Sequence, residues 1–439
     1  MGKSMKNKFL VLAVVLTLVT SLVIAGCVPA PPPVTPPPVT PPVTPPVTPP
    51  PVTPPPVEPV EPLVIGTSMG RTGWMAVVEV DLGDMMIIYA DKVNKEGGIN
   101  GRPVEFIIYD NESTTELAVT QTTKLIEEDE ALIVISQLWS GPTWAQYEII
   151  KDTGVPFIIM VGGPQPDEVF IPGENMFNNH PSYDFFAEAT LRYFKEDLGL
   201  TRVAFLATSD ESGEEDLEWG LEHAEKLGLE VVLVERCDPE AMDVTAQLTR
   251  IKAANPEALQ LAGSGVVVGP MFKGIKLLGL DIPISTANGM TNPEGTELMK
   301  GYEPEVLVMP VMPPQAGAIP GILPADDPIM IVIDEMWDLW EEYYGETRGT
   351  KADLCFGWSW FGWDVMEIAV EGLRQAGPLP DDLAEARETV RSAMENKIIG
   401  FETEWGTRTY SPTDKCGLEK FCPALMTMVD GELILLKQL

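Results

Sequence analysis

"YADKVNKEGGINGRPVEFIIYDNES" (residues 89–113) joins the end of one segment to the start of another, and it decides the fold. Residues 75–93 have helical periodicity, and residues 104–109 form a β-rich run. Between them the pair Gly97-Gly98 predicts a left-handed helix cap, and Gly101 turns the chain into the strand. By itself the stretch predicts only a helix-to-strand turn, so the elements on either side must be considered.

Short apolar runs alternate with helical segments along the chain after residue 62. Two such series, each with its own β-α-β run, predict an α/β protein with two doubly wound lobes of parallel sheet. The predicted strands cover residues 63–67, 104–109, 131–136, 155–160, 202–208, 230–236, 257–263 and 283–287. The predicted helices cover residues 75–93, a segment ending near 128, and 181–199, 213–227, 243–254 and 270–280.

The strands end in polar, glycine-rich segments: "SMGRTG", "SQLWSGP", "VGGPQ", "TSDESG" and "GSG". Ligands of open parallel sheets bind beyond the carboxyl ends of the strands, and short glycine-rich loops let the backbone approach them. We therefore expect a small-molecule cleft where the strand ends of the two lobes face each other.

The opening stretch resembles the extracytoplasmic solute-binding proteins of the leucine/isoleucine/valine type. "TTKLIEEDEALIVIS", "TGVPFII", "WSWFGWDVMEIAVEGLRQAG" and "IIGFETEWG" extend the resemblance over the chain after residue 62. The resemblance implies the type I periplasmic-binding fold, with lobe 1 at 63–180 and 314–398 and lobe 2 at 181–313 and 399–439. It also implies three hinge crossings, near residues 178–181, 310–314 and 399–401.

The resemblance further implies which residues bind the ligand. Ser140, beside Trp139, matches the serine that binds an amino acid carboxylate in that family. Gly162 and Gly163 replace a threonine that binds the ammonium group, and Asn288 replaces an acid. These departures leave amides and other small organic solutes open as ligands beside amino acids.

In the second lobe, Asp210 and Ser212 stand where the family often has an aromatic residue. Trp74, Trp139 and Trp358 are candidates for the pocket wall, and each is equally compatible with core packing. Arg71 could pair with a ligand carboxylate or could be a solvated loop residue.

The first residues predict export and a lipid anchor. Three lysines and no acid precede an apolar run over residues 9–24, and "IAGC" resembles the bacterial lipobox. Residues 1–26 are then a signal peptide, and Cys27 carries the lipid that holds the protein to the outer face of the cell membrane or in the periplasm. An ordinary export signal or an uncleaved anchor is the alternative. The proline-rich segment that completes 27–62 predicts a polyproline II stalk rather than a ligand for SH3-like domains.

Composition excludes several classes of function. The formal charge is −37, from 29 basic and 66 acidic residues, which argues against nucleic acid as a partner. With only two histidines the chain is poorly supplied for a histidine-based metal site or catalytic triad, and we expect no metal, no cofactor and no enzymatic activity. "GSGVVVG" (263–269) lacks the dinucleotide-binding spacing. Cys416 and Cys422 are predicted to form a disulfide, and Cys237 and Cys355 to lie in the core.

These observations predict a receptor that closes on a small organic solute, an amino acid, an amide or a related compound, and delivers it to an ABC permease with its ATPase subunits. A sensing module of the same fold, which passes closure to a signalling partner, is the alternative. The sequence does not specify the ligand, the type of cell envelope or the oligomeric state.

Overall fold

The computed structural model describes residues 60–438 apart from 162–174, 182, 265, 288–289, 291–296, 303, 305, 318, 320–321, 346–347, 419–423 and 430–431. Residues 59–439 form one compact unit. The predicted signal peptide, Cys27 and nearly all of the predicted stalk lie outside the described residues. No helix in the described ranges is long and apolar enough to cross a membrane.

The first lobe is built on a five-stranded parallel sheet of order β2-β1-β3-β4-β5. Its register is fixed by apolar residues; Ile65, for example, pairs with Phe106 on one side and Ile133 on the other. Strands β1, β3, β4 and β5 are largely buried, as expected for parallel strands covered on both faces, whereas the edge strand β2 is mostly half-buried. The strands are β1 (Leu63–Met69), β2 (Val104–Asp110), β3 (Ile133–Ile135), β4 (Phe157–Ile159) and β5 (Met176–Asn178).

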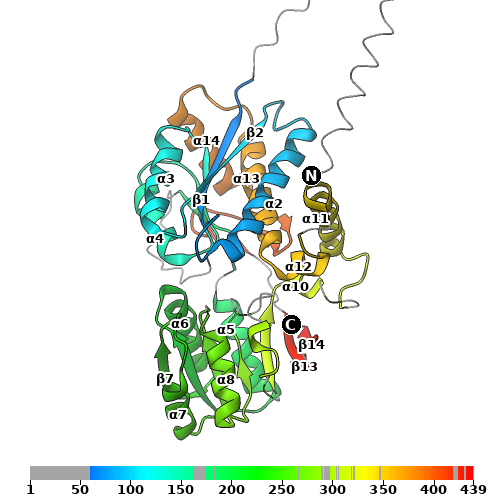
Figure 1. Ribbon diagram of the computed structural model, residues 1–439. Helices are drawn as coiled ribbons and strands as arrows, with labels where there is room; N and C mark the ends of the chain where they lie inside the picture. Colours follow the sequence, from blue (N-terminus) through cyan, green and yellow to red (C-terminus); the bar gives the residue numbers. More distant parts are fainter. Residues whose placement is uncertain are drawn as a thin grey trace, which may run out of the picture. The chain divides into compact units, whose positions relative to one another are not determined.

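Helices cover both faces of this sheet. Helices α3 and α4 lie on one face, and α2 and α13 lie on the other (Figure 1). Gly362 permits the close approach of α13 to α2, because a Cβ atom there would collide with the carbonyl oxygen of Leu82. The helices are α2 (Ala76–Lys95), α3 (Thr115–Glu127), α4 (Ser140–Ile150), α13 (Ser359–Ala376) and α14 (Leu383–Lys397).

Three further helices lie between residues 313 and 356, and the sequence analysis did not predict them. They are α10 (Pro313–Gly317), α11 (Pro328–Tyr344) and α12 (Lys351–Phe356). Asp327 caps α11 by accepting a hydrogen bond from the Ile329 N–H, and Trp340 of this helix is buried in the same core as α2 and α13. Helix α11 therefore contributes to the first-lobe core around α13.

The second lobe contains a seven-stranded sheet of order β14-β13-β10-β9-β8-β6-β7. Helices α5 and α6 pack on one face, and α7 and α8 on the other. The strands are β6 (Arg202–Thr208), β7 (Glu230–Cys237), β8 (Ala258–Ala262), β9 (Ile284–Ser285), β10 (Leu307–Val311), β13 (Ala424–Val429) and β14 (Glu432–Gln438). The helices are α5 (Tyr183–Arg192), continued by the π-helical turn η1 (Tyr193–Asp197), α6 (Glu211–Lys226), α7 (Thr245–Ala253) and α8 (Val268–Leu278).

The two predicted parallel-sheet lobes are thus present, with one addition at the edge of the second sheet. Strands β6 to β10 are parallel, but β13 pairs antiparallel with β10, and β14 pairs antiparallel with β13. The sequence signal for this hairpin is the Asp430-Gly431 pair between two apolar runs.

A small hairpin, β11 (Phe401–Thr403) and β12 (Gly406–Arg408), follows α14 and packs on the first lobe. The Arg408 guanidinium donates to the carbonyl oxygens of Asn178 (3.3 Å), Cys416 (3.0 Å) and Asn179. It therefore fastens the C-terminal segment to the chain after β5. Residues 401–418 pack with the first-lobe core, although the predicted second lobe resumes at residue 399. The other domain boundaries remain a prediction.

The cysteines are partly as predicted. Cys237 and Cys355 are buried, which confirms their assignment to the core. The predicted disulfide is not present at Cys416, whose thiol is free, and Cys422 lies outside the described residues. The Cys416 carbonyl is held by Arg408, and burial raises the pKa of the Cys416 thiol.

Candidate functional site

Ser140 is the first residue of α4, directly after the loop that leaves β3. It is 2% exposed, and its hydroxyl donates to Glu215 Oε2 at 3.1 Å. One turn later on the same helix, the Trp144 indole N–H donates to Glu215 Oε1 at 3.3 Å. Glu215 belongs to α6 of the second lobe, so its carboxylate is bonded by two groups of the first lobe.

The Glu215 carboxylate is 8% exposed. Burial raises its pKa to about 7, against the hydrogen bonds from Trp144 and Ser140, and the neighbouring Glu211 and Asp210 charges raise it further. The sequence analysis did not single out Glu215, because "SDESGEEDLEWG" contains several acids on one helix and nothing in their spacing distinguishes it. Glu215 is distinguished from the other acids only in the folded protein, where two residues of α4 donate hydrogen bonds to it.

A second buried carboxylate, Glu79 of α2, shapes the first-lobe side of the site. It is fully buried and accepts hydrogen bonds from the backbone N–H groups of Gly70 and, at 2.8 Å, Leu138. Burial raises its pKa to about 7. Glu79 therefore ties the turn after β1 to the loop after β3, and it positions the segment that carries Trp139 and Ser140.

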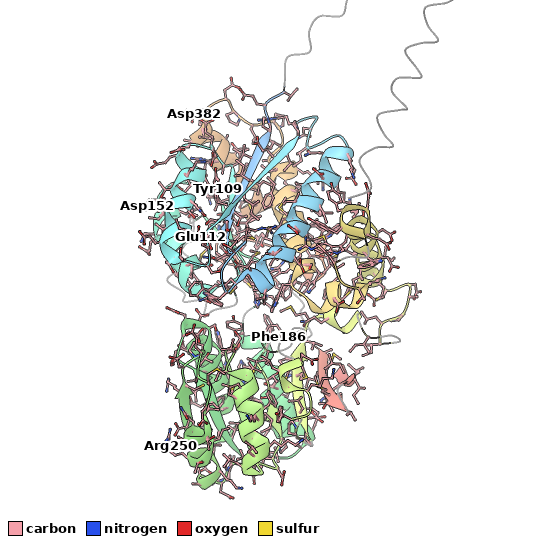
Figure 2. The ribbon with its side chains drawn as sticks, viewed as in Figure 1. Tyr109, Glu112, Asp152, Phe186, Arg250 and Asp382 are labelled. Carbon is pink, nitrogen blue, oxygen red and sulfur yellow. The ribbon has the colours of Figure 1, made fainter. Side chains whose placement is uncertain are left out.

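The turn after β1 is also held from β2. The Asp110 carboxylate accepts from the backbone N–H groups of Arg71 and Thr72, both at 3.0 Å, and from the Thr72 hydroxyl at 2.8 Å. Ser113 accepts from the Met75 N–H at 3.0 Å and donates to the Thr72 carbonyl. Figure 2 labels Tyr109 and Glu112, which flank this part of the loop. The "DNES" segment thus supports the first turn.

Trp74 and Trp139 form an aromatic pair at the ends of β1 and β3. Their ring centroids are 4.9 Å apart and their planes meet at 76°, an edge-to-face contact. Trp74 is 59% exposed, which leaves most of its ring available to a ligand. Trp139 directly precedes Ser140 in the chain, so the structure brings three of the predicted site residues together.

Arg71 lies in the same turn, but its guanidinium is already engaged. It donates to the Val80 carbonyl at 2.6 Å and pairs with Asp84, which also pairs with Arg348. The structure therefore gives Arg71 a role within the first lobe. Trp358 is 7% exposed and belongs to the first-lobe core, where it packs near Phe361.

In the second lobe, Asp210 is the N-cap residue of α6, although its side chain makes no hydrogen bond to the helix backbone. It accepts from the Thr208 hydroxyl at 2.5 Å and from the Ser212 hydroxyl at 3.2 Å. Asp216, one residue after Glu215, accepts from the Gly263 N–H at 2.9 Å, and burial raises its pKa to about 7. The glycine-rich segment after β8 therefore packs on the segment after β6. Gly162, Gly163 and Asn288 lie outside the described residues.

Hydrogen bonds from α4 of the first lobe to α6 of the second join the two lobes at this site. The family model for periplasmic binding protein covers residues 62–417. This chain is a member of the periplasmic binding protein family. The family consists of binding proteins rather than enzymes, in agreement with the predicted lack of enzymatic activity.

Several relatives of this periplasmic binding protein are known. An amino acid binding protein of Pseudomonas aeruginosa is 24% identical over 218 residues, 48% of this chain and 58% of the relative. The leucine-, isoleucine-, valine-, threonine-, and alanine-binding protein of the same organism is 23% identical over 220 residues, 49% of this chain and 58% of the relative. The matches thus span less than two thirds of each relative.

Solved structures match over a longer range. The crystal structure of an extracellular ligand-binding receptor from Rhodopseudomonas palustris HaA2 covers 85% of this periplasmic binding protein and 99% of its own chain, with a TM-score of 0.73 and 21% identity. At that identity the match establishes the fold. The ligand has to be argued from the site itself.

Proposed function

We propose that this periplasmic binding protein is a membrane-tethered receptor that binds an amino-acid-like solute between its lobes and delivers it to an ABC permease. The observation that carries the proposal is the Glu215 carboxylate, which lies between Ser140 and Trp144 of the opposite lobe. A buried acid at the meeting point of the two lobes is a partner for a ligand ammonium group. The names of the Pseudomonas aeruginosa relatives support an amino acid as the ligand class.

The ligand's three parts each have a partner in this site. Its ammonium group pairs with Glu215 and releases the Ser140 hydroxyl from that carboxylate. The ligand carboxylate then accepts from the Ser140 hydroxyl and from backbone N–H groups at the start of α4. Its side chain packs on the exposed ring of Trp74 beside Trp139. Glu215 thereby supplies the acid whose apparent loss at Asn288 made an amine ligand doubtful from sequence.

Closure follows from contacts to both lobes. A solute that touches Ser140 and Glu215 together stabilises the closed form by its differential affinity for that form over the open one. The permease then recognises the closed form, and its ATPase subunits drive transport. A sensing module of the same fold would bind ligand equally well but would not stimulate ATP hydrolysis by a reconstituted permease.

The binding experiment uses the purified full chain and a panel of amino acids, their amides and small organic acids. We expect an amino acid to raise the melting temperature of the wild type. Ser140→Ala and Glu215→Gln should weaken this ligand at least about tenfold, since each removes a hydrogen bond to a charged group. Glu218→Gln, at an exposed position on the same helix, is the matched control. Retained affinity in both site variants would place the ligand elsewhere.

The tether is tested separately. Residues 1–59 lie outside the described part of the chain, so the lipid at Cys27 is proposed from the lipobox-like sequence and the family's extracytoplasmic role. Wild-type protein expressed in bacteria should partition into the detergent phase and carry a mass increase at its N-terminus. Cys27→Ser should stay in the aqueous phase. Equal partitioning of the two proteins would remove the lipid anchor from the proposal.

A further inference from the structure

Three carboxylates meet beside the β11–β12 hairpin, apart from the candidate ligand site. Asp364 and Glu367 lie three residues apart on α13, on one face of the helix, and Glu404 lies in the turn of the hairpin. One oxygen from each carboxylate lies within 4.8 Å of the other two. Asp364 is fully buried and Glu404 is 4% exposed, so the cluster is largely withdrawn from water.

The charges of this cluster are poorly compensated by the described residues. Both Asp364 oxygens and Glu404 Oε2 lack a hydrogen-bond partner, whereas Glu367 accepts from the Trp363 indole N–H at 3.1 Å. Arg408 is the cation whose charge acts most strongly on Asp364, but its Nη atoms donate to backbone carbonyls instead. Buried carboxylates without partners are costly, so such a group calls for a cation or for shared protons.

The side chain of Asn179 is a second, independent indication of a bound cation. Asn179 is fully buried, and neither its amide oxygen nor its amide nitrogen has a hydrogen-bond partner among the described residues. The amide lies close enough to the Asp364 carboxyl to lower its pKa. Its backbone is fixed, since the Asn179 N–H donates to the Ile159 carbonyl at 2.9 Å. A buried amide with no hydrogen-bond partner in the described ranges is therefore held beside the cluster.

We propose that Asp364, Glu367 and Glu404 bind a divalent cation beside the Asn179 amide, with Ca²⁺ preferred to Mg²⁺. The carboxylate donors are oxygens, which suits hard cations rather than zinc or copper. Mg²⁺ usually keeps several of its waters, so a buried set of protein oxygens favours Ca²⁺. With all three carboxyls ionised, the single charge of Arg408 leaves two negative charges, which one divalent ion neutralises.

The position of this site defines its effect. The ion joins α13 of the first lobe to the β11–β12 turn and to Asn179, the first residue after β5. The chain then runs on to α5, whose Phe186 (Figure 2) packs in the same buried cluster as Trp405. A bound ion therefore fixes the start of the crossing predicted at residues 178–181. It does not contact Ser140 or Glu215, so the cation site is independent of the proposed solute.

The test uses the full chain, freed of metal with a chelator, and Tb³⁺ as a luminescent substitute for Ca²⁺. Trp363 bonds directly to Glu367, so excitation of tryptophan should sensitise bound Tb³⁺. We expect saturable emission from one ion per chain, which Ca²⁺ displaces at lower concentration than Mg²⁺. Calcium should also raise the melting temperature of the metal-free protein.

Two matched variants identify the ligands. Glu367→Gln should weaken Tb³⁺ binding at least about tenfold. Glu371→Gln, one turn further along α13, where the acid accepts only from Gln375 among the interactions described, should bind as the wild type does. If Glu367→Gln fails to fold, the wild-type competition decides alone. Absent emission, equal loss in both variants, or a melting temperature unmoved by calcium would overturn the cation site and leave shared protons as the explanation.

Discussion

The hydroxyl of Ser140 donates to Glu215 across the two lobes, from the first residue of α4 to the second turn of α6. Both helices follow strands of parallel sheets, β3 in the first lobe and β6 in the second. Ligands of such sheets bind where those helices begin. The hydrogen bond therefore marks where the two predicted halves of the site meet, and it makes the protonation state of Glu215 a variable of ligand binding.

Affinity for an amine-bearing ligand should depend on pH through Glu215. Burial raises the pKa of this carboxyl to about 7, and only the ionised form pairs with an ammonium group. As pH falls below about 7, each unit should raise the apparent Kd about tenfold. Isothermal titration calorimetry between about pH 5.5 and 8 measures this slope. Glu215→Gln should bind weakly with no slope in this range, and Glu218→Gln should reproduce the wild type; a flat wild-type profile contradicts the assignment.

Stability should fall with rising pH because of Glu79. Its folded-state pKa is about 7, above the ordinary value of 4.5, so between these values the folded protein holds a proton that the unfolded chain releases. This contribution is present below about pH 4.5 and is lost as pH rises through about 7, a loss of about 3 kcal/mol. Glu79→Gln should remove that part of the pH dependence.

Urea denaturation at several pH values measures the effect of Glu79. Glu116→Gln, at an exposed position on α3, is the control and should keep the wild-type pH dependence. If Glu79→Gln and the wild type lose stability in parallel between about pH 4.5 and 7, the buried carboxyl is not the source of the change.

The alternation of buried runs and helices was sufficient to predict most of the fold. Runs such as residues 202–208 are apolar and short, with helical segments between them, and β6 has those bounds. The strand predicted at 131–136 is shorter, Ile133–Ile135. The β13–β14 hairpin was missed because its strands follow each other without a helix between them, unlike the predicted parallel strands. The hairpin β11–β12 was missed because its strands have three residues each, too few for a periodic signal.

The resemblance pointed to Ser140 and Trp139, and Trp74 follows the first strand end; the structure places Trp74 against Trp139, which precedes Ser140. That these residues bind a ligand stays a prediction. Glu79 and Glu215 were not predicted, because each is one acid among many on its helix and becomes distinctive only through burial against another segment. Arg71 shows the converse: its place in the turn suggested a ligand contact, but Asp84 of α2 engages its guanidinium.

Gly263→Ala should destabilise the second lobe. Gly263 has a φ of 85°, and a Cβ there would collide with the Thr208 hydroxyl and approach the Cα of Gly213 to 3.0 Å. We expect a loss of about 2–3 kcal/mol in the free energy of unfolding, from backbone strain together with the collision. Gly279→Ala is the matched control, because its φ of 57° is also positive but nothing lies within 4 Å. Chemical denaturation should show the control losing about 1 kcal/mol; equal losses would mean that the collision is relieved.

Arg408→Lys should loosen the attachment of the C-terminal segment. The buried guanidinium donates to three backbone carbonyls, on Asn178, Asn179 and Cys416, from two Nη atoms. A lysine ammonium is a single compact donor centre and cannot span these acceptors, so at least one carbonyl loses its partner. We expect a loss of about 2–3 kcal/mol in the free energy of unfolding. Arg374→Lys, at an exposed position on α13, should lose less than about 0.5 kcal/mol. Denaturation in the presence of chelator separates this effect from that of any bound cation. If Arg408→Lys is as stable as the wild type under those conditions, the three hydrogen bonds do not hold the segment.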